Sequence, residues 1–192
     1  MAEELSIFVP SPAMSPKLIF QKPRLSEHQA AGSTRDIGDF GLWTLDFGLY
    51  PSVVSKKSAK IATLIGSCQG RDIDAHYLGY FECFNHGFYY EAHDVLEELW
   101  LRDRHGRDGA FYKGLIQLAG AFVHMQKNRL RPAAALLKLT RANLLRYPAK
   151  HASLDLNSAL AVVEDWLRRL ESDNFTTNPL GPANAPKLSL LP

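Results

Sequence analysis

"FYYEAHDVLEELW", residues 88–100, carries the pattern of an amphipathic helix. Four apolar side chains recur at the helical spacing that places them on one face: Ala92, Val95, Leu96 and Leu99. At about 100° per residue, His93, Glu97 and Trp100 lie together on one flank of this apolar stripe. Asp94 falls farther from its centre, so we expect that carboxylate to face solvent. A histidine and a carboxylate beside a buried face are the first candidate functional residues.

Helical periodicity continues on both sides of this stretch. It predicts five helices, at residues 72–87, 88–103, 111–128, 132–147 and 155–172. The connections between them are short, which favours antiparallel neighbours in a bundle. The third helix is apolar nearly all round, as is typical of a helix buried on several sides. We therefore predict an all-α fold, a compact bundle of about five helices with an irregular N-terminal extension.

Proline content divides the chain into three regions. Residues 1–70 hold five prolines and no sustained helical period, which predicts an irregular N-terminal extension. Residues 71–173 are the predicted helical bundle domain. Residues 174–192 hold four prolines and are predicted to form a Pro-rich tail.

Composition limits the binding partners and the cellular compartment that we expect for this protein. The net charge of +2 gives no attraction to nucleic acid or to an anionic membrane surface. No uncharged apolar run approaches the length of a membrane span, so we expect no membrane association. Cys68 and Cys83 show neither a metal-binding spacing nor a disulfide framework, which favours a reducing compartment. We expect a soluble, cytoplasmic protein.

Two polar side chains interrupt the third helix. Gln117 and His124 are its only strongly polar interior groups, and they lie seven residues apart, nearly in line along the axis. A buried amide and a buried imidazole both need hydrogen-bond partners. The nearest expected partners are on the flank that carries His93 and Glu97. We therefore expect these four side chains to meet between the second and third helices.

Two sequence blocks in this order resemble the domain of unknown function 309 (DUF309) family. They are "FNHGFYYEAHDVLEELW" (84–100) and "GLIQLAGAFVHMQ" (114–126), within a resemblance over residues 75–147. The residues that match the family pattern are Phe84, Asn85, Gly87, Glu91, Ala92, His93, Glu97, Trp100, Gly114, Gln117 and His124. The resemblance implies an all-helical fold and the family's broad label, predicted metal-dependent hydrolase. The turn after the third helix departs from the family, with Asn128-Arg129 where Gly-Asn is common.

Three interpretations of these residues stay open. His93, Glu97 and His124 form a two-histidine, one-carboxylate set that suits a divalent metal ion, with Glu97 and Gln117 as candidate catalytic residues. Alternatively, the same residues form a structural network in which Glu97 accepts hydrogen bonds from a histidine and from Trp100 or Gln117. A metal-free acid–base site is the third interpretation.

Two functional hypotheses follow from these interpretations. The first is a metal-dependent hydrolase with a small-molecule substrate. The second is a non-catalytic helical module for interaction or homo-oligomerisation, in which the histidine–glutamate–glutamine network is structural.

Overall fold

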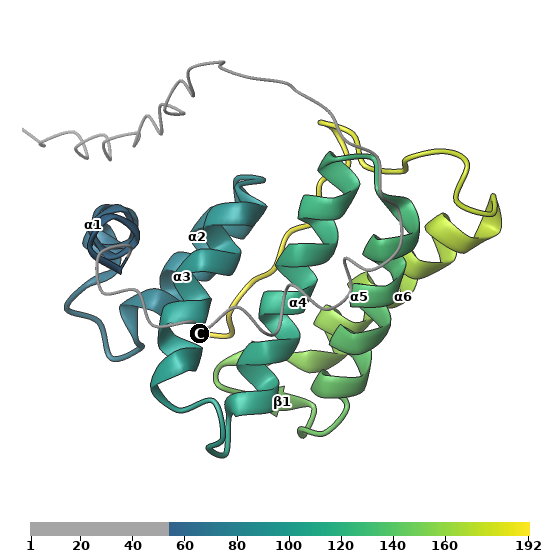
Figure 1. The fold of residues 1–192 in the computed structure, drawn as a ribbon. Coiled ribbons are helices and arrows are strands. Elements are labelled where there is room, and N and C mark those ends of the chain that lie inside the picture. The colour runs from purple at the N-terminus through teal and green to yellow at the C-terminus, as the bar shows by residue number, and fades with distance from the viewer. Residues whose placement is uncertain (1–53) are drawn as a thin grey trace, which may run out of the picture. The chain divides into compact units, whose positions relative to one another are not determined.

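A computed structural model describes the backbone of residues 54–192 and the side chains from residue 60 onward. Residues 1–53, which include most of the predicted N-terminal extension, lie outside the described residues. The described elements belong to one contact unit, Leu49–Pro192 (Figure 1). In chain order they are α1 (Val54–Ile65), the 3-10 turn η1 (Gly66–Cys68), α2 (Ala75–Asn85), α3 (Tyr89–Arg102), α4 (Gly109–Gln126), α5 (Leu130–Leu144), β1 (Lys150–His151), β2 (Leu154–Asp155) and α6 (Leu156–Ser172).

The prediction of a mostly helical, compact fold is confirmed. Helices α2 to α6 correspond to the five predicted helices, with ends that differ by a few residues. Helix α2 begins after Asp74, whose carboxylate accepts a hydrogen bond from the backbone N–H of His76 at 2.8 Å and so caps the helix. Gly87 has a φ of +77° and ends α2 in the left-handed conformation that its sequence position predicted. None of the described helices is long and apolar enough to cross a membrane.

Helix α1 differs from the expectation, because residues 54–65 are helical within a stretch predicted to be irregular. Among its described side chains, Ile61 and Ile65 are buried, and they form a small apolar cluster with Val95 of α3. Gly79 of α2 allows this close packing, since a Cβ there would lie 2.8 Å from Cγ2 of Ile65. Two isoleucines therefore hold a lysine-rich helix against the domain.

Helix α4 occupies the centre of the domain, as its apolar sequence predicted. It packs against α3 on one side and α5 on the other, and Figure 1 shows it between them. Phe122 of α4 is fully buried, and its ring lies 4.9 Å from that of Tyr89 and 5.0 Å from that of Trp166. These aromatic contacts join α3, α4 and α6 through one core.

A small hairpin that the sequence did not predict precedes α6. Strands β1 and β2 pair antiparallel, and the two residues between them, Ala152 and Ser153, both have positive φ, as a tight hairpin requires. Asp155 then caps α6 by accepting hydrogen bonds from the N–H groups of Asn157 and Ser158. The hairpin thus sets the start of the last helix.

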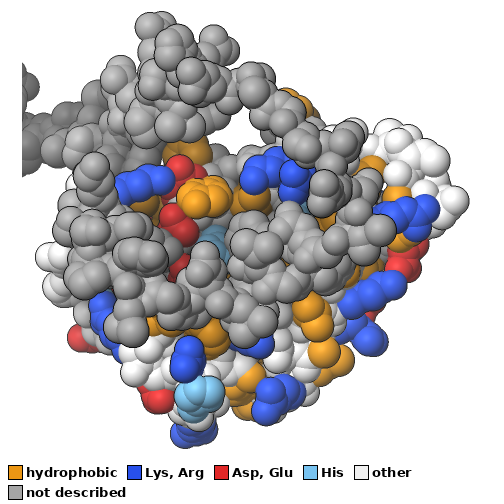
Figure 2. Space-filling view, in the orientation of Figure 1, with side chains coloured by type: hydrophobic (Ala, Val, Ile, Leu, Met, Phe, Trp, Pro, Cys, Tyr) orange, Lys and Arg blue, Asp and Glu red, His pale blue; other side chains and the backbone are white. Residues whose placement is uncertain are grey.

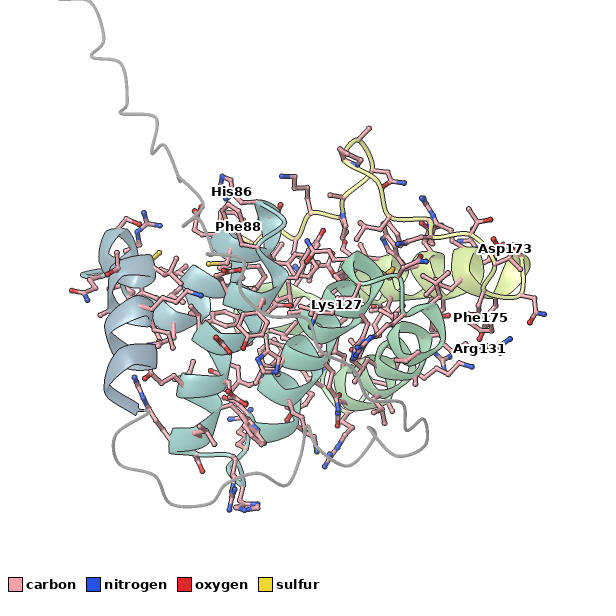
Figure 3. All side chains as sticks on the ribbon, turned by 45° about the horizontal axis from the view of Figure 1, so that its top comes forward. His86, Phe88, Lys127, Arg131, Asp173 and Phe175 are labelled. Atoms are coloured by element: carbon pink, nitrogen blue, oxygen red, sulfur yellow. The ribbon has the colours of Figure 1, made fainter. Side chains whose placement is uncertain are left out.

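The Pro-rich segment after α6 packs against the domain without forming a helix. The guanidinium of Arg131 lies 4.7 Å from the ring of Phe175, just after α6 (Figure 3). Farther along, the amide of Asn85 on α2 exchanges two hydrogen bonds with the backbone of Leu188, each 2.8 Å long. Leu188 is buried, so the segment contributes to the core.

Candidate functional site

A cluster of three metal-ligating side chains lies on helix α3. His93, Asp94 and Glu97 each offer one ligand atom, and these atoms all lie within 4.8 Å of one another. Nδ1 of His93 is 3.5 Å from Oδ1 of Asp94, and both side chains are largely shielded from water. The arrangement gives one nitrogen and two oxygen ligands on consecutive turns of a single helix. Figure 2 shows acidic and histidine side chains close together near the middle of the face of the molecule that is turned to the viewer.

Asp94 corrects the sequence interpretation. Its position outside the apolar stripe predicted a solvent-facing carboxylate, but the residue is only 9% exposed. Helix α3 is contacted by α1, α2 and α4, so more than one face of it is covered. A residue outside the main apolar stripe can therefore be buried as well. The sequence analysis missed the burial of Asp94 because the periodicity of one helix does not show how many other helices pack around that helix.

His124 lies in the last turn of α4 and is 8% exposed. It is not one of the three residues whose ligand atoms fall within 4.8 Å of one another. The structure thus places a ligand atom of His93 near one of Glu97, and adds Asp94, which the sequence analysis did not select as a ligand.

Gln117 has a partner that the sequence did not identify. Its Oε1 accepts a hydrogen bond of 2.8 Å from Nδ2 of Asn143 on α5. The expected partners were His93 and Glu97 on α3, on the other side of α4. Gly114 permits this contact, because a Cβ there would lie 3.2 Å from the Cβ of Asn143. Gln117 therefore links α4 to α5.

Trp100 does not form the predicted hydrogen bond to Glu97. Its Nε1 is buried and has no hydrogen-bond partner among the described residues. Trp100 instead forms part of the lining of a pocket at the end of α3, where α3, α4 and α5 converge. The three-residue cluster and the pocket-lining Trp100 thus lie on the same helix, with Trp100 nearer its C-terminal end.

Comparison with known proteins identifies the part of the chain that carries these residues. Residues 77–143 match the model of the DUF309 family, a domain of unknown function. This stretch is similar to the DUF309 domain. It runs from within α2 to within α5 and contains His93, Asp94, Glu97, Gln117 and His124. No curated protein and no solved structure matches the chain significantly.

Outside this cluster, the stretch that matches the DUF309 model holds a cysteine that is poorly suited to nucleophilic chemistry. Burial, followed by the nearby charge of Glu91, raises the pKa of the Cys83 thiol to about 12. The thiolate is the nucleophilic form, so almost none of it exists at neutral pH. Cys83 is 2% exposed and serves as a core residue.

Proposed function

We propose that the DUF309 domain binds a divalent metal ion through His93, Asp94 and Glu97 and acts as a metal-dependent hydrolase on a small molecule. The observation that supports this proposal is the convergence of three ligand atoms within 4.8 Å. Imidazole suits zinc, iron and nickel, whereas carboxylates suit magnesium and manganese as well. The mixed set therefore favours a first-row transition metal.

Three protein ligands leave coordination positions for water and substrate, as in catalytic metal sites. A bound divalent ion supplies Lewis acidity, which lowers the pKa of water toward neutrality and polarises a substrate oxygen. His93, Asp94 and Glu97 would hold the ion. His124 remains a candidate additional ligand from the facing helix.

Gln117 would act as a positioning residue in this proposal. Asn143 holds its Oε1, which leaves the Nε2 amide hydrogens as donors. A fixed amide donor can orient a carbonyl or phosphoryl oxygen of a substrate. Gln117→Glu would keep the size of the side chain but remove both donor hydrogens.

The test is metal-dependent stability of the full chain. The thermal midpoint is measured after chelation and again after addition of Mn²⁺, Zn²⁺ or Ni²⁺. We expect the midpoint to rise with metal, because binding to the native state alone stabilises it. Asp94→Asn should abolish the rise, whereas Glu164→Gln, a change on the exposed face of α6, should leave it intact. A midpoint that no metal changes in the native chain would overturn the proposal.

The second candidate is a non-catalytic module in which these polar residues fix the packing of the helices. The hydrogen bond between Gln117 and Asn143 favours it, because that contact joins two helices without any ligand. In this case chelation leaves stability unchanged, while Gln117→Leu destabilises the domain by leaving the Asn143 amide without its acceptor. Sedimentation of the full chain would then test for homo-oligomerisation.

A further inference from the structure

A second concave site lies at the end of the domain where α3 ends, α4 begins and α5 ends. Its volume is about 340 Å³, at the lower end of the range for small-molecule pockets. Its lining includes Trp100 from α3, Arg104 from the connection to α4, Ala110 and Lys113 from α4, and Arg146 after α5. Figure 2 shows basic and histidine side chains gathered along this lower edge of the molecule.

The charge of this pocket is of one sign. Among the described residues, its charged lining side chains are Arg104, Lys113 and Arg146, and no carboxylate lines it. Among the described residues, none of these three cations forms an ion pair, and the Nε of Arg104 donates only to His105. Elsewhere on the surface, by contrast, Lys138 is neutralised by Glu171. The pocket cations are therefore available to an anionic ligand.

Hydrogen-bond donors also lie at or near this positively charged pocket. The N–H of Gly109 bonds to the carbonyl of Gly106, and the N–H of Phe111 bonds to the hydroxyl of Tyr147. Ala110, between them in the first turn of α4, lines the pocket. The buried Nε1–H of Trp100 has no acceptor among the described residues. An indole nitrogen can only donate, so Trp100 is a further hydrogen-bond donor among the residues that line the pocket.

We propose that this pocket binds the phosphoryl group of a small molecule. Arginine and lysine supply charge and charge-assisted hydrogen bonds to phosphate oxygens. The N-terminus of α4 adds backbone donors and the positive end of its dipole. The site uses none of the metal-ligating residues, so it does not depend on metal binding.

The experiment is calorimetric titration of the full chain with inorganic phosphate and with phenyl phosphate, both in the presence of a chelator. We expect both to bind in the millimolar range or more tightly. Phenyl phosphate should bind more tightly if the rest of the cavity holds the organic portion, and equally if the site takes free phosphate. Sodium chloride should weaken binding, because it screens the cationic side chains.

Variants locate the site. The double change Lys113→Ala and Arg146→Ala should weaken binding by about tenfold or more, as expected for lost hydrogen bonds between charged groups. The control, Lys138→Ala with Arg168→Ala, removes the same charge from exposed positions on α5 and α6 and should leave binding unchanged. Lys113→Arg keeps the charge and should also retain binding.

Trp100→Phe provides an independent readout, because it keeps an aromatic ring but removes the N–H. It should weaken binding and remove any change in tryptophan fluorescence that phosphate produces. Absence of binding to both compounds at millimolar concentration would overturn the proposal. Equal weakening by the control pair, or binding that requires added metal and is lost in His93→Ala, would also overturn it.

Discussion

On the surface formed by α5 and α6, oppositely charged side chains form solvent-exposed ion pairs, whereas the ionisable side chains of the α3 cluster are largely shielded from solvent. Lys138 and Glu171 are 62% and 46% exposed and lie 2.8 Å apart. Asp94 and its neighbour His93 are mostly buried. Ionisable side chains are thus exposed to solvent on the α5–α6 surface and shielded from it on α3. Because desolvated polar groups depend on their partners, the α3 region should be far more sensitive to substitution.

The largest expected effect comes from the buried apolar face of α3, the helix that carries the cluster. Leu96 is fully buried, and Leu96→Ala should destabilise the domain by about 2–5 kcal/mol through lost burial and a residual cavity. The control is Leu139→Ala on α5, where the leucine is 46% exposed and the cost should stay within about 0.5 kcal/mol. Denaturant titration of both variants measures the difference. Equal costs would remove the contrast between the regions.

A double-mutant cycle on His93 and Asp94 tests the cluster itself. Their 3.5 Å contact predicts a coupling energy of about 0.5–3 kcal/mol, since the two groups share one shielded environment. The cycle uses alanine at each position and at both, with unfolding followed in the presence of chelator. Coupling in chelator measures the protein contact alone. Strict additivity would mean that the cluster contributes no interaction of its own.

Asp74 lies between the two extremes, since it caps α2 while partly exposed. Asp74→Ala should cost about 0.5–2 kcal/mol, as for other N-cap residues. Burial opposes ionisation of Asp74, but hydrogen bonds from His76 and the charges of His76 and Arg102 outweigh it and lower the pKa.

A lowered folded-state pKa fixes the sign of the pH dependence. The contribution of Asp74 is present above the ordinary aspartate pKa of 3.8 and is lost as pH falls through the lower folded value. The stability gap between the native chain and Asp74→Ala should therefore narrow in acid. Thermal midpoints between pH 7 and pH 3 measure it, with Asp74→Asn as the variant that cannot titrate. A gap that widens in acid would contradict this assignment.

The smallest effect is expected on the exposed surface. The pair of Lys138 and Glu171 should couple by less than about 1 kcal/mol. High salt should remove even this energy, because exposed charges are screened. A cycle of Lys138→Ala and Glu171→Ala at low and high salt provides the measurement. A large, salt-resistant coupling would show that exposure does not separate the two regions.

Periodicity predicted α2 to α6 because each carries several apolar residues at helical spacing. It missed α1 because, of the side chains described on that helix, only Ile61 and Ile65 are buried, and their burial depends on Gly79 and Val95 elsewhere in the chain. Local sequence cannot reveal a helix whose apolar partners are supplied by other helices.

Only the part of the candidate site that depends on spacing along a single helix was predictable from the sequence. His93 and Glu97 fall together because a spacing of four places them one turn apart. The partner of Gln117 was not predictable, since spacing along α4 fixes the direction of the side chain relative to its own helix alone. Whether that direction meets α3 or Asn143 on α5 depends on how the helices are arranged around α4.

The reciprocal hydrogen bonds between Asn85 and Leu188 have a consequence for the order of folding. They join residues 103 positions apart, whereas consecutive helices contact one another across short connections. Closing so long a loop costs more chain entropy, so we expect the segment around Leu188 to dock after the helices have packed. The amide of Leu188 donates to Asn85, and its hydrogen exchange would report this docking step separately from global unfolding. We therefore expect the segment around Leu188 to undock locally, at a rate of its own, without unfolding of the helices.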